Sequence, residues 1–120
     1  MPCKILILAE HESGALRETT FELLGMAHRV AGQAGWPPSE IKAALIGQGA
    51  GERAKSVAAR GAAEVIYAEG DAVKDYTCDG STRVLEAIIK SESPEMVLVG
   101  HTPNGWDTAP MVAAGLGLPI

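Results

Sequence analysis

Three short stretches of this sequence combine residue types that could bind a ligand or carry out chemistry. Glu10, His11 and Glu12 form a cluster of the kind used for metal binding or acid–base catalysis. Gly47, Gly49 and Gly51 form a GxGxG run, and residues 100–108 form a loop punctuated by glycines. Such residues are also typical of turns between strands and helices. A chemical and a structural interpretation are therefore available for each stretch.

The first stretch favours a polar turn over a metal or acid–base site. No second His, Asp or Glu group stands at ligand spacing from Glu10, His11 and Glu12. Ser13 and Gly14 follow directly, and both residue types are common in turns that lead into a helix. Glu10 and His11 are still expected to shape the crevice at the end of the first strand.

The second stretch is a weak signal for a dinucleotide. Gly47, Gly49 and Gly51 lack the third glycine of the GxGxxG fingerprint, and they follow the second predicted strand instead of the first. Glu69 and Asp71 stand close to the offset of a ribose anchor, but they fall in a predicted loop. A flexible turn that enters a helix is the favoured interpretation.

The third stretch, 100–108, could present backbone N–H groups to an anion. The weak anion or nucleotide candidates are Gly100, Thr102, Gly105 and Asp107. Asp107 or Thr108 is predicted to cap a helix that starts near Ala109, and a capping carboxylate disfavours a second anion there. The loop also lacks the lysine and the GK[ST] end of a P-loop. A capped turn is slightly favoured over a phosphate site.

The remaining reactive side chains form no catalytic or metal-binding pattern. His28 falls inside the first predicted helix, and His101 has no Ser or Cys arranged around it in the sequence. Cys3 and Cys78 are far apart and form no CxxC motif, so two reduced thiols are predicted. No catalytic residue, metal site or enzymatic activity is expected.

Four nearly continuous hydrophobic runs predict buried parallel strands that position these loops. They are Lys4–Glu10, Lys42–Gly47, Glu64–Glu69 and Glu95–Gly100. Helical periodicity follows each run, in stripes at Leu16, Thr20, Leu23, Leu24, Ala27, Ala31 and Ala34, at Ala54, Val57 and Ala58, at Leu85, Ile88 and Ile89, and at Ala109, Val112, Ala113 and Leu116. The alternating order predicts an α/β fold, a Rossmann-like doubly wound parallel sheet with helices on both faces.

Composition narrows the class of protein. With 120 residues and 47% hydrophobic content, the chain is the size of one domain with a real core. Its net charge of -5 and its lack of a basic cluster disfavour nucleic-acid binding. The longest apolar run near the N-terminus, Ile5–Ala9, is too short for a signal peptide or a membrane span, so a cytoplasmic protein without membrane insertion is expected.

The sequence resembles the N-terminal domain of the electron-transfer flavoprotein alpha (large) subunit over essentially all of residues 1–120. The first similar segment is ILILAEHESGALRETTFELLGMA. The second, VLVGHTPNGWDTAPMVAAGLGLP, is similar to the family pattern GxTxxGRDxAPRVAARLG. Trp106 and Met111 depart from that pattern, because the family usually has Arg at the first position and often at the second. Contacts made by those cations are therefore expected to be absent here.

The resemblance implies electron transfer in a heterodimer with a beta subunit, between flavoprotein dehydrogenases and an acceptor. It implies that FAD is held mainly by a separate C-terminal domain and that no cofactor is bound by this chain alone. The loop 100–108 would then face a partner subunit. The alternatives are an adenine-nucleotide-binding module of the universal-stress-protein kind and a small interaction module without a ligand.

The resemblance also implies an adenine nucleotide alpha hydrolase-like fold with strand order 3-2-1-4-5. The fourth predicted strand would then be interior, but the sequence stops at GLGLPI, where the fifth strand would begin. An order of 3-2-1-4 with the fifth strand missing is therefore expected, and residues 96–99 would form an unpaired apolar edge. We expect the chain to be a fragment that lacks the C-terminal FAD-binding domain.

Overall fold

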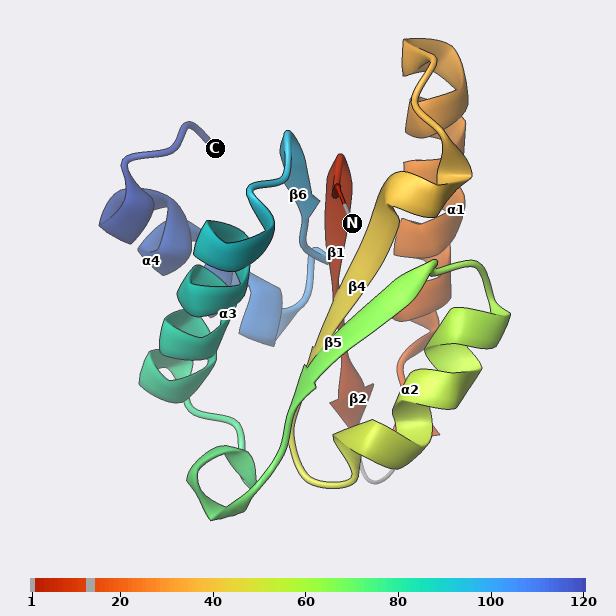
Figure 1. Ribbon diagram of the computed structural model, residues 1–120. Helices are drawn as coiled ribbons and strands as arrows, with labels where there is room; N and C mark the ends of the chain where they lie inside the picture. Colours follow the sequence, from red (N-terminus) through yellow and green to blue (C-terminus); the bar gives the residue numbers. More distant parts are fainter. Residues whose placement is uncertain (1, 13–14) are drawn as a thin grey trace.

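A single parallel sheet forms the centre of the computed structural model, which describes residues 2–12 and 15–120 (Figure 1). Its strands are β1 (Ile5–Ala9), β4 (Ile41–Ile46), β5 (Glu64–Ala68) and β6 (Met96–Leu98). They lie in the order β5-β4-β1-β6, which is the 3-2-1-4 order predicted from the sequence. The fold class and the order of the strands are thus confirmed.

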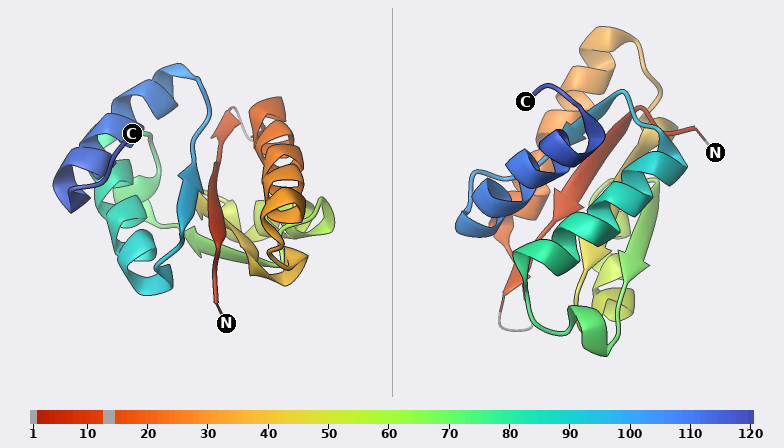
Figure 2. Two further views of the ribbon diagram at one scale, coloured as in Figure 1. Left: turned by 90° about the horizontal axis from the view of Figure 1, so that it is seen from above. Right: turned by 90° about the vertical axis from the view of Figure 1, so that its left-hand side faces the viewer.

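In the part of the chain that the structure describes, four α-helices cover the two faces of the sheet. Their bounds are Glu18–Ala34 (α1), Ala50–Ala59 (α2), Cys78–Glu92 (α3) and Pro103–Leu116 (α4), and short 3-10 turns stand at Pro38–Glu40 (η1) and Asp71–Val73 (η2). Helices α1 and α2 lie on one face and α3 and α4 on the other (Figure 2). This is the doubly wound arrangement that right-handed crossovers produce when the chain moves first to one side of β1 and then to the other.

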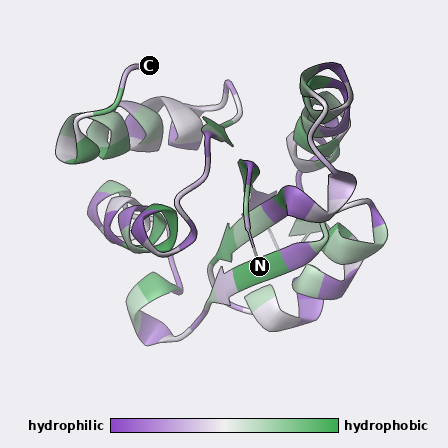
Figure 3. Ribbon diagram, turned by 45° about the horizontal axis from the view of Figure 1, so that its top comes forward, coloured by the Kyte–Doolittle hydropathy of each residue, from purple (hydrophilic) through white to green (hydrophobic). Residues whose placement is uncertain are grey.

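The first strand is buried on both faces, which explains its unbroken hydrophobic sequence. Ile5, Ile7 and Ala9 pack against the α1 and α2 layer, while Leu6 and Leu8 pack against the α3 and α4 layer. β1 pairs in parallel with β4 over five residues and with β6 over three. Hydrophobic residues accordingly run along the central strands, between the two helical layers (Figure 3).

The segment after β1 differs from the prediction. Leu16 was expected in the first helix, but it belongs to a short antiparallel hairpin of β2 (His11–Glu12) and β3 (Ala15–Leu16). The helix begins at Glu18 and ends at Ala34, and it is followed by Gly35, whose φ of 75° is the left-handed conformation that favours glycine. Ser13 and Gly14, in the predicted turn, lie outside the described residues.

One charged side chain is buried in the α3 and α4 layer. Lys42 of β4 is 1% exposed, and its Nζ donates to Glu92 of α3 and lies 3.1 Å from the Glu64 carboxylate of β5. Burial pulls the pKa of the Lys42 amine down, but the hydrogen bonds and charges of Glu92 and Glu64 outweigh it and raise the pKa above its ordinary value. This ion cluster ties β4, β5 and α3 together.

The two edges of the sheet have different surroundings. β5 pairs only with β4, and β6 pairs only with β1, so both are edge strands among residues 2–12 and 15–120. The edge at residues 96–99 has no strand beside it among the described residues, as predicted from the sequence, and Val97 and Val99 pack with the α3 and α4 layer. No helix in the described part of the chain is both long and apolar enough to cross a membrane.

Candidate functional site

The carboxyl edge of the sheet gathers the three stretches that the sequence singles out. Glu10 and His11 follow β1, Gly47 follows β4, and Gly100 follows β6. A cavity of about 70 Å³ lies there, lined by Glu10, His11 and Gly47 and by the first turns of α3 and α4. Parallel strands bring their carboxyl ends to one side, which is where doubly wound folds bind ligands. This edge is therefore the candidate site.

Helix α4 begins earlier than predicted and has a different cap. Thr102 is the N-cap, and its hydroxyl accepts a hydrogen bond of 3.0 Å from the backbone N–H of Gly105. Pro103 occupies the first turn, where its missing N–H costs nothing. The prediction that Asp107 or Thr108 caps this helix is wrong, because both lie inside it. The signal that could have located the start was a threonine directly before a proline.

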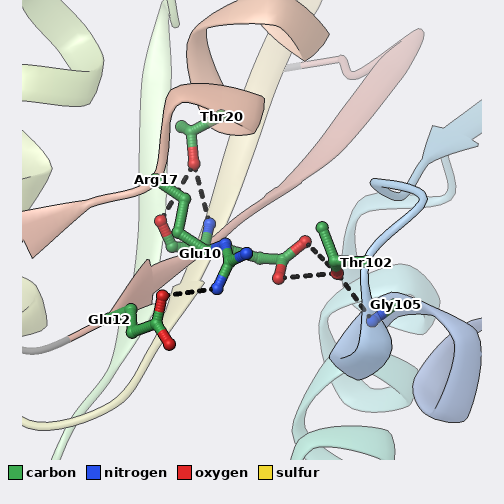
Figure 4. A network of polar contacts seen from close by, with 6 residues as sticks. All are labelled: Glu10, Glu12, Arg17, Thr20, Thr102 and Gly105. Carbon is green, nitrogen blue, oxygen red and sulfur yellow. Dashed lines mark hydrogen bonds and ion pairs between the residues drawn. The ribbon is translucent and has the colours of Figure 1, made fainter.

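Glu10 is the carboxylate that meets the start of α4 (Figure 4). Its side chain is buried, and Thr102 Oγ1 lies 2.9 Å from each carboxylate oxygen and donates its hydrogen there. The backbone N–H of Glu10 donates to Thr20 Oγ1 at 2.8 Å, and the Thr20 hydroxyl donates to the Glu10 carbonyl at 3.0 Å. The Thr102 hydroxyl thus accepts from Gly105 and donates to Glu10, so the end of β1 is joined to the cap of α4.

Two glycines allow this contact. A Cβ on Gly100 would lie 2.9 Å from Glu10 Oε2 and 2.5 Å from Thr19 Cγ2, and a Cβ on Gly105 would lie 2.0 Å from the Gly100 carbonyl oxygen. Side chains at either position would clash with groups of the chain itself. These two glycines therefore have a structural reason to be glycine, which is close packing between β6, α4 and Glu10.

The GxGxG run is likewise occupied by the chain's own groups. Gly49 is the N-cap of α2 in the left-handed conformation, and the Gly51 N–H donates to Glu69 Oε2 at 3.2 Å. His11 Nε2 lies 2.9 Å from the Ile46 carbonyl oxygen and packs so closely on Gly47 that a Cβ there would be 2.2 Å away. Glu69, which was considered as a ribose anchor, instead lies against the first turn of α2, where a carboxylate is favourable.

The cavity itself is narrow and covered. The segment 72–77 forms one wall, and the hydroxyl of Tyr76 lies 3.0 Å from Thr108 Oγ1 and 3.2 Å from the Asn104 carbonyl oxygen. Burial of the phenol against Thr108 raises the pKa of Tyr76. Ligand pockets commonly measure roughly 300 to 1,000 Å³. A cavity of about 70 Å³ has no room for an adenine nucleotide in this conformation.

The other reactive side chains lie apart from this edge or serve local packing. His28 Nε2 lies 2.9 Å from the Gly61 carbonyl oxygen, and His101 contacts the exposed Trp106 edge-on. Cys3 and Cys78 are both free thiols; burial raises the pKa of Cys3. Within residues 2–12 and 15–120, no group of three or more His, Cys, Asp or Glu side chains is arranged to hold a metal ion.

Comparison with known proteins adds a family match and several relatives. The model for the electron transfer flavoprotein domain matches residues 5–120. The chain is 34% identical over 113 residues to the electron transfer flavoprotein subunit alpha of Bacillus subtilis, covering 94% of this chain and 33% of that protein. It is 34% identical over 112 residues to the acryloyl-CoA reductase electron transfer subunit beta of Anaerotignum propionicum, covering 93% of this chain and 30% of that protein.

A third relative is subunit LctC of the NAD(+),ferredoxin lactate dehydrogenase of Acetobacterium woodii. The identity is 32% over 110 residues, covering 92% of this chain and 26% of that protein. The chain therefore spans about a third or less of the length of these curated relatives.

Proposed function

Because the chain belongs to the electron transfer flavoprotein domain family, we propose that it serves as the N-terminal domain of an alpha-type subunit. Its task in this proposal is to assemble with a beta subunit, while FAD is held by another domain of the complete alpha subunit. The assembled protein would pass electrons between flavoprotein dehydrogenases and an acceptor. The proposal includes a cytoplasmic location, which is expected from the sequence alone.

The observation that carries this assignment is the occupied carboxyl edge. The described N-termini of α2, α3 and α4 each have an N–H satisfied by a side chain of the chain itself: Glu69, Thr77 and Thr102. Glu10 adds a buried negative charge behind Thr102, which disfavours a phosphate at the start of α4. An assembly domain fits this edge better than a nucleotide-binding module does.

The surface of α4 is the proposed contact with the beta subunit. Trp106 is 63% exposed and Met111 is 50% exposed, so the two departures from the family pattern lie on the outside of this helix. Exposed tryptophans commonly contribute much of the binding energy of an interface. Replacement of an arginine by Trp106 would exchange a charged contact for an apolar one and would change the choice of partner.

Co-purification tests the assembly role. The chain is produced with the beta subunit encoded in the same genome, and we expect the two to elute together, without stoichiometric flavin absorbance in the chain purified alone. Trp106→Ala should weaken the association by about tenfold or more, the effect of losing an interface hot spot. Met26→Ala, a change at an exposed site on α1, is the matched control and should leave the association unchanged. Failure of the wild-type chain to bind the beta subunit would contradict the proposal.

Calorimetry distinguishes the proposed assembly domain from the alternative, an adenine-nucleotide-binding module. Titration with AMP or ATP should give no heat of binding, because the cavity is too small and its helix N-termini are capped. Binding of either nucleotide in the micromolar range would favour the universal-stress-protein kind of module instead.

A further inference from the structure

The two helices on one face of the sheet begin with the same sequence pattern. Each has a capping threonine, and an acid or amide directly followed by glycine stands two residues later: TCDG at 77–80 of α3 and TPNG at 102–105 of α4. In both helices the threonine hydroxyl accepts a hydrogen bond of 3.0 Å from the N–H of that glycine. Asn104, in the second pattern, is the only asparagine of the sequence.

Asparagine followed by glycine is chemically unstable. The backbone nitrogen of the glycine attacks the side-chain carbonyl carbon of the asparagine, a C–N bond forms, and the displaced amide leaves as ammonia, carrying the proton of the backbone nitrogen. Water then opens the resulting succinimide ring at either carbonyl, which gives aspartate or isoaspartate. Glycine favours the attack because it has no Cβ to obstruct its nitrogen. Aspartate followed by glycine forms the same ring with loss of water instead of ammonia.

Packing requires the glycine that makes this dipeptide reactive. Gly105 is buried, and a Cβ there would lie 2.0 Å from the Gly100 carbonyl oxygen and 3.1 Å from Val99 Cγ1. Asn104 directly precedes it, is half-buried and lines the cavity of about 70 Å³ at the carboxyl edge. The reactive dipeptide therefore lies in the wall of the candidate site, at a position where the fold needs glycine.

The first turn of α4 opposes the reaction in two ways. The N–H of Gly105 is bonded to the Thr102 hydroxyl, which is itself held by its hydrogen bond to the buried Glu10 carboxylate (Figure 4). Asn104 also lies inside the helix, where ψ is roughly −42° and the side-chain carbon is held away from the next backbone nitrogen. Ring closure therefore requires the first turn to open.

We propose that Asn104–Gly105 is a deamidation site and that the Thr102 hydroxyl controls its rate. The reaction proceeds from the open turn, so its rate follows the population in which the Gly105 N–H is released. Isoaspartate at 104 adds a methylene to the backbone of this turn and a negative charge to a cavity wall shared with Glu10. The modification thus alters the start of α4 irreversibly. The proposal holds whether or not the chain assembles with a beta subunit.

Incubation of the purified chain in mildly alkaline, isotope-labelled water tests the proposal. Opening of the succinimide incorporates the label, so peptide mass spectrometry measures the reaction at Asn104. We expect the native chain to react at least about tenfold more slowly than the same chain unfolded in guanidinium chloride. Thr102→Ala should raise the native rate by about fivefold, the change in open population expected from loss of a typical N-cap. Thr102→Ser keeps the hydroxyl and should react at the wild-type rate.

The start of α3 supplies a matched control. Thr77→Ala removes the corresponding cap, so it should speed label incorporation at Asp79 and leave the rate at Asn104 unchanged. Thr102→Ala should have the opposite selectivity. Asn104→Gln lengthens the side chain, which disfavours the five-membered ring, and it should abolish the signal assigned to position 104.

Three outcomes would overturn the proposal. The first is an equal rate at Asn104 in the native and unfolded wild type, which would mean that the turn gives no protection. The second is an unchanged rate in Thr102→Ala. The third is equal acceleration at Asn104 by Thr77→Ala and Thr102→Ala, which would assign the reaction to global unfolding. Should Thr102→Ala fail to fold, Thr102→Gly removes the same hydroxyl at a smaller cost to the helix, with an expected increase of about twofold.

Discussion

Both edges of the sheet leave backbone N–H and C=O groups without a neighbouring strand in the described residues, but the side chains around the two edges differ. The β5 edge begins with Glu64, which pairs with Lys42, and ends beside Glu69 and the half-exposed Tyr67. The groove next to it measures about 400 Å³ and includes Arg83 and Glu92 in its lining. The β6 edge has cavities of about 610 and 540 Å³, which are lined by valine and leucine side chains and also by Lys90, Glu95, His101 and Trp106. Natural proteins shield free edges with charge, and Glu64 and Arg83 provide such shielding beside β5.

The difference shows that an edge strand can be classified by the free energy of desolvating the side chains around it when another strand pairs with it. Beside β5, such a strand would have to desolvate Glu64 and Arg83, which costs free energy unless each is paired again. Beside β6, it would desolvate valine and leucine side chains, which is favourable. Three changes test this contrast, in order of their expected effect on stability or association.

The largest effect is expected from removing the cation at the β5 side. Lys42→Met leaves the partly exposed Glu64 and Glu92 carboxylates without their buried partner, and it should lower the free energy of unfolding by roughly 1 to 3 kcal/mol. Denaturant unfolding followed by circular dichroism measures this. Lys42→Met combined with Glu64→Gln and Glu92→Gln should recover most of the loss. If the single variant is as stable as the wild type, the ion cluster does not support the β5 edge.

The same cluster predicts a dependence on pH. The pKa of Lys42 is raised above its ordinary 10.5, so its contribution to stability is complete below that pH. The contribution is lost as the pH rises through the higher folded-state pKa. We therefore expect the difference in free energy of unfolding between the wild type and Lys42→Met, measured from pH 8 to 11.5, to decrease only at the alkaline end of this range.

A smaller effect is expected where α4 is fixed over the β6 edge. Thr102→Ala removes the N-cap and the hydrogen bonds to Glu10, and it should lower the free energy of unfolding by roughly 0.5 to 2 kcal/mol. Asp107→Ala is the control, and it should change stability by less than about 0.5 kcal/mol because Asp107 lies inside the helix. If Asp107→Ala lowered stability more than Thr102→Ala, Asp107 would be the cap instead of Thr102.

The smallest effect on stability, and a distinct effect on association, is expected at the two edges themselves. Val99→Lys should reduce any self-association through β6 at high protein concentration, because a charge on an apolar edge opposes edge-to-edge pairing. Tyr67→Lys on β5 is the matched change and should leave association as it is. Light scattering over a concentration series compares them. Equal behaviour of the two variants would remove the distinction between the edges.

The fold was largely predictable because its signals are local and repeated. Buried parallel strands need continuous apolar runs, and the runs around Ile5, Lys42, Glu64 and Met96 gave four strands in the observed order. The hairpin of β2 and β3 was missed because each of its strands is two residues long. Leu16 fits the helical stripe as well as it fits a strand, so periodicity alone predicts the wrong element for it.

The candidate site was less predictable because its main contact joins residues distant in sequence. Glu10 and Thr102 are separated by most of the chain, and no local pattern indicates that they meet. The start of α4 was misplaced for a different reason: Asp107 and Thr108 are both favourable capping residue types, whereas the observed start is marked by Thr102 directly before Pro103. The anion and nucleotide roles considered for Gly100, Thr102, Gly105 and Asp107 remain untested predictions.

The position of β1 in the sheet has a consequence for how the chain reaches its native state. β1 is made first, but its register partner for Ile5 on one side is Ile41 and on the other is Met96. β1 can therefore pair on its second side only after the residues of β6 have been made, and the backbone groups on that side stay unpaired until then. Contacts of such long sequence separation slow folding and expose strand edges to wrong partners. The central strand of the sheet is thus the first of the four to be made and the last to be paired on both sides.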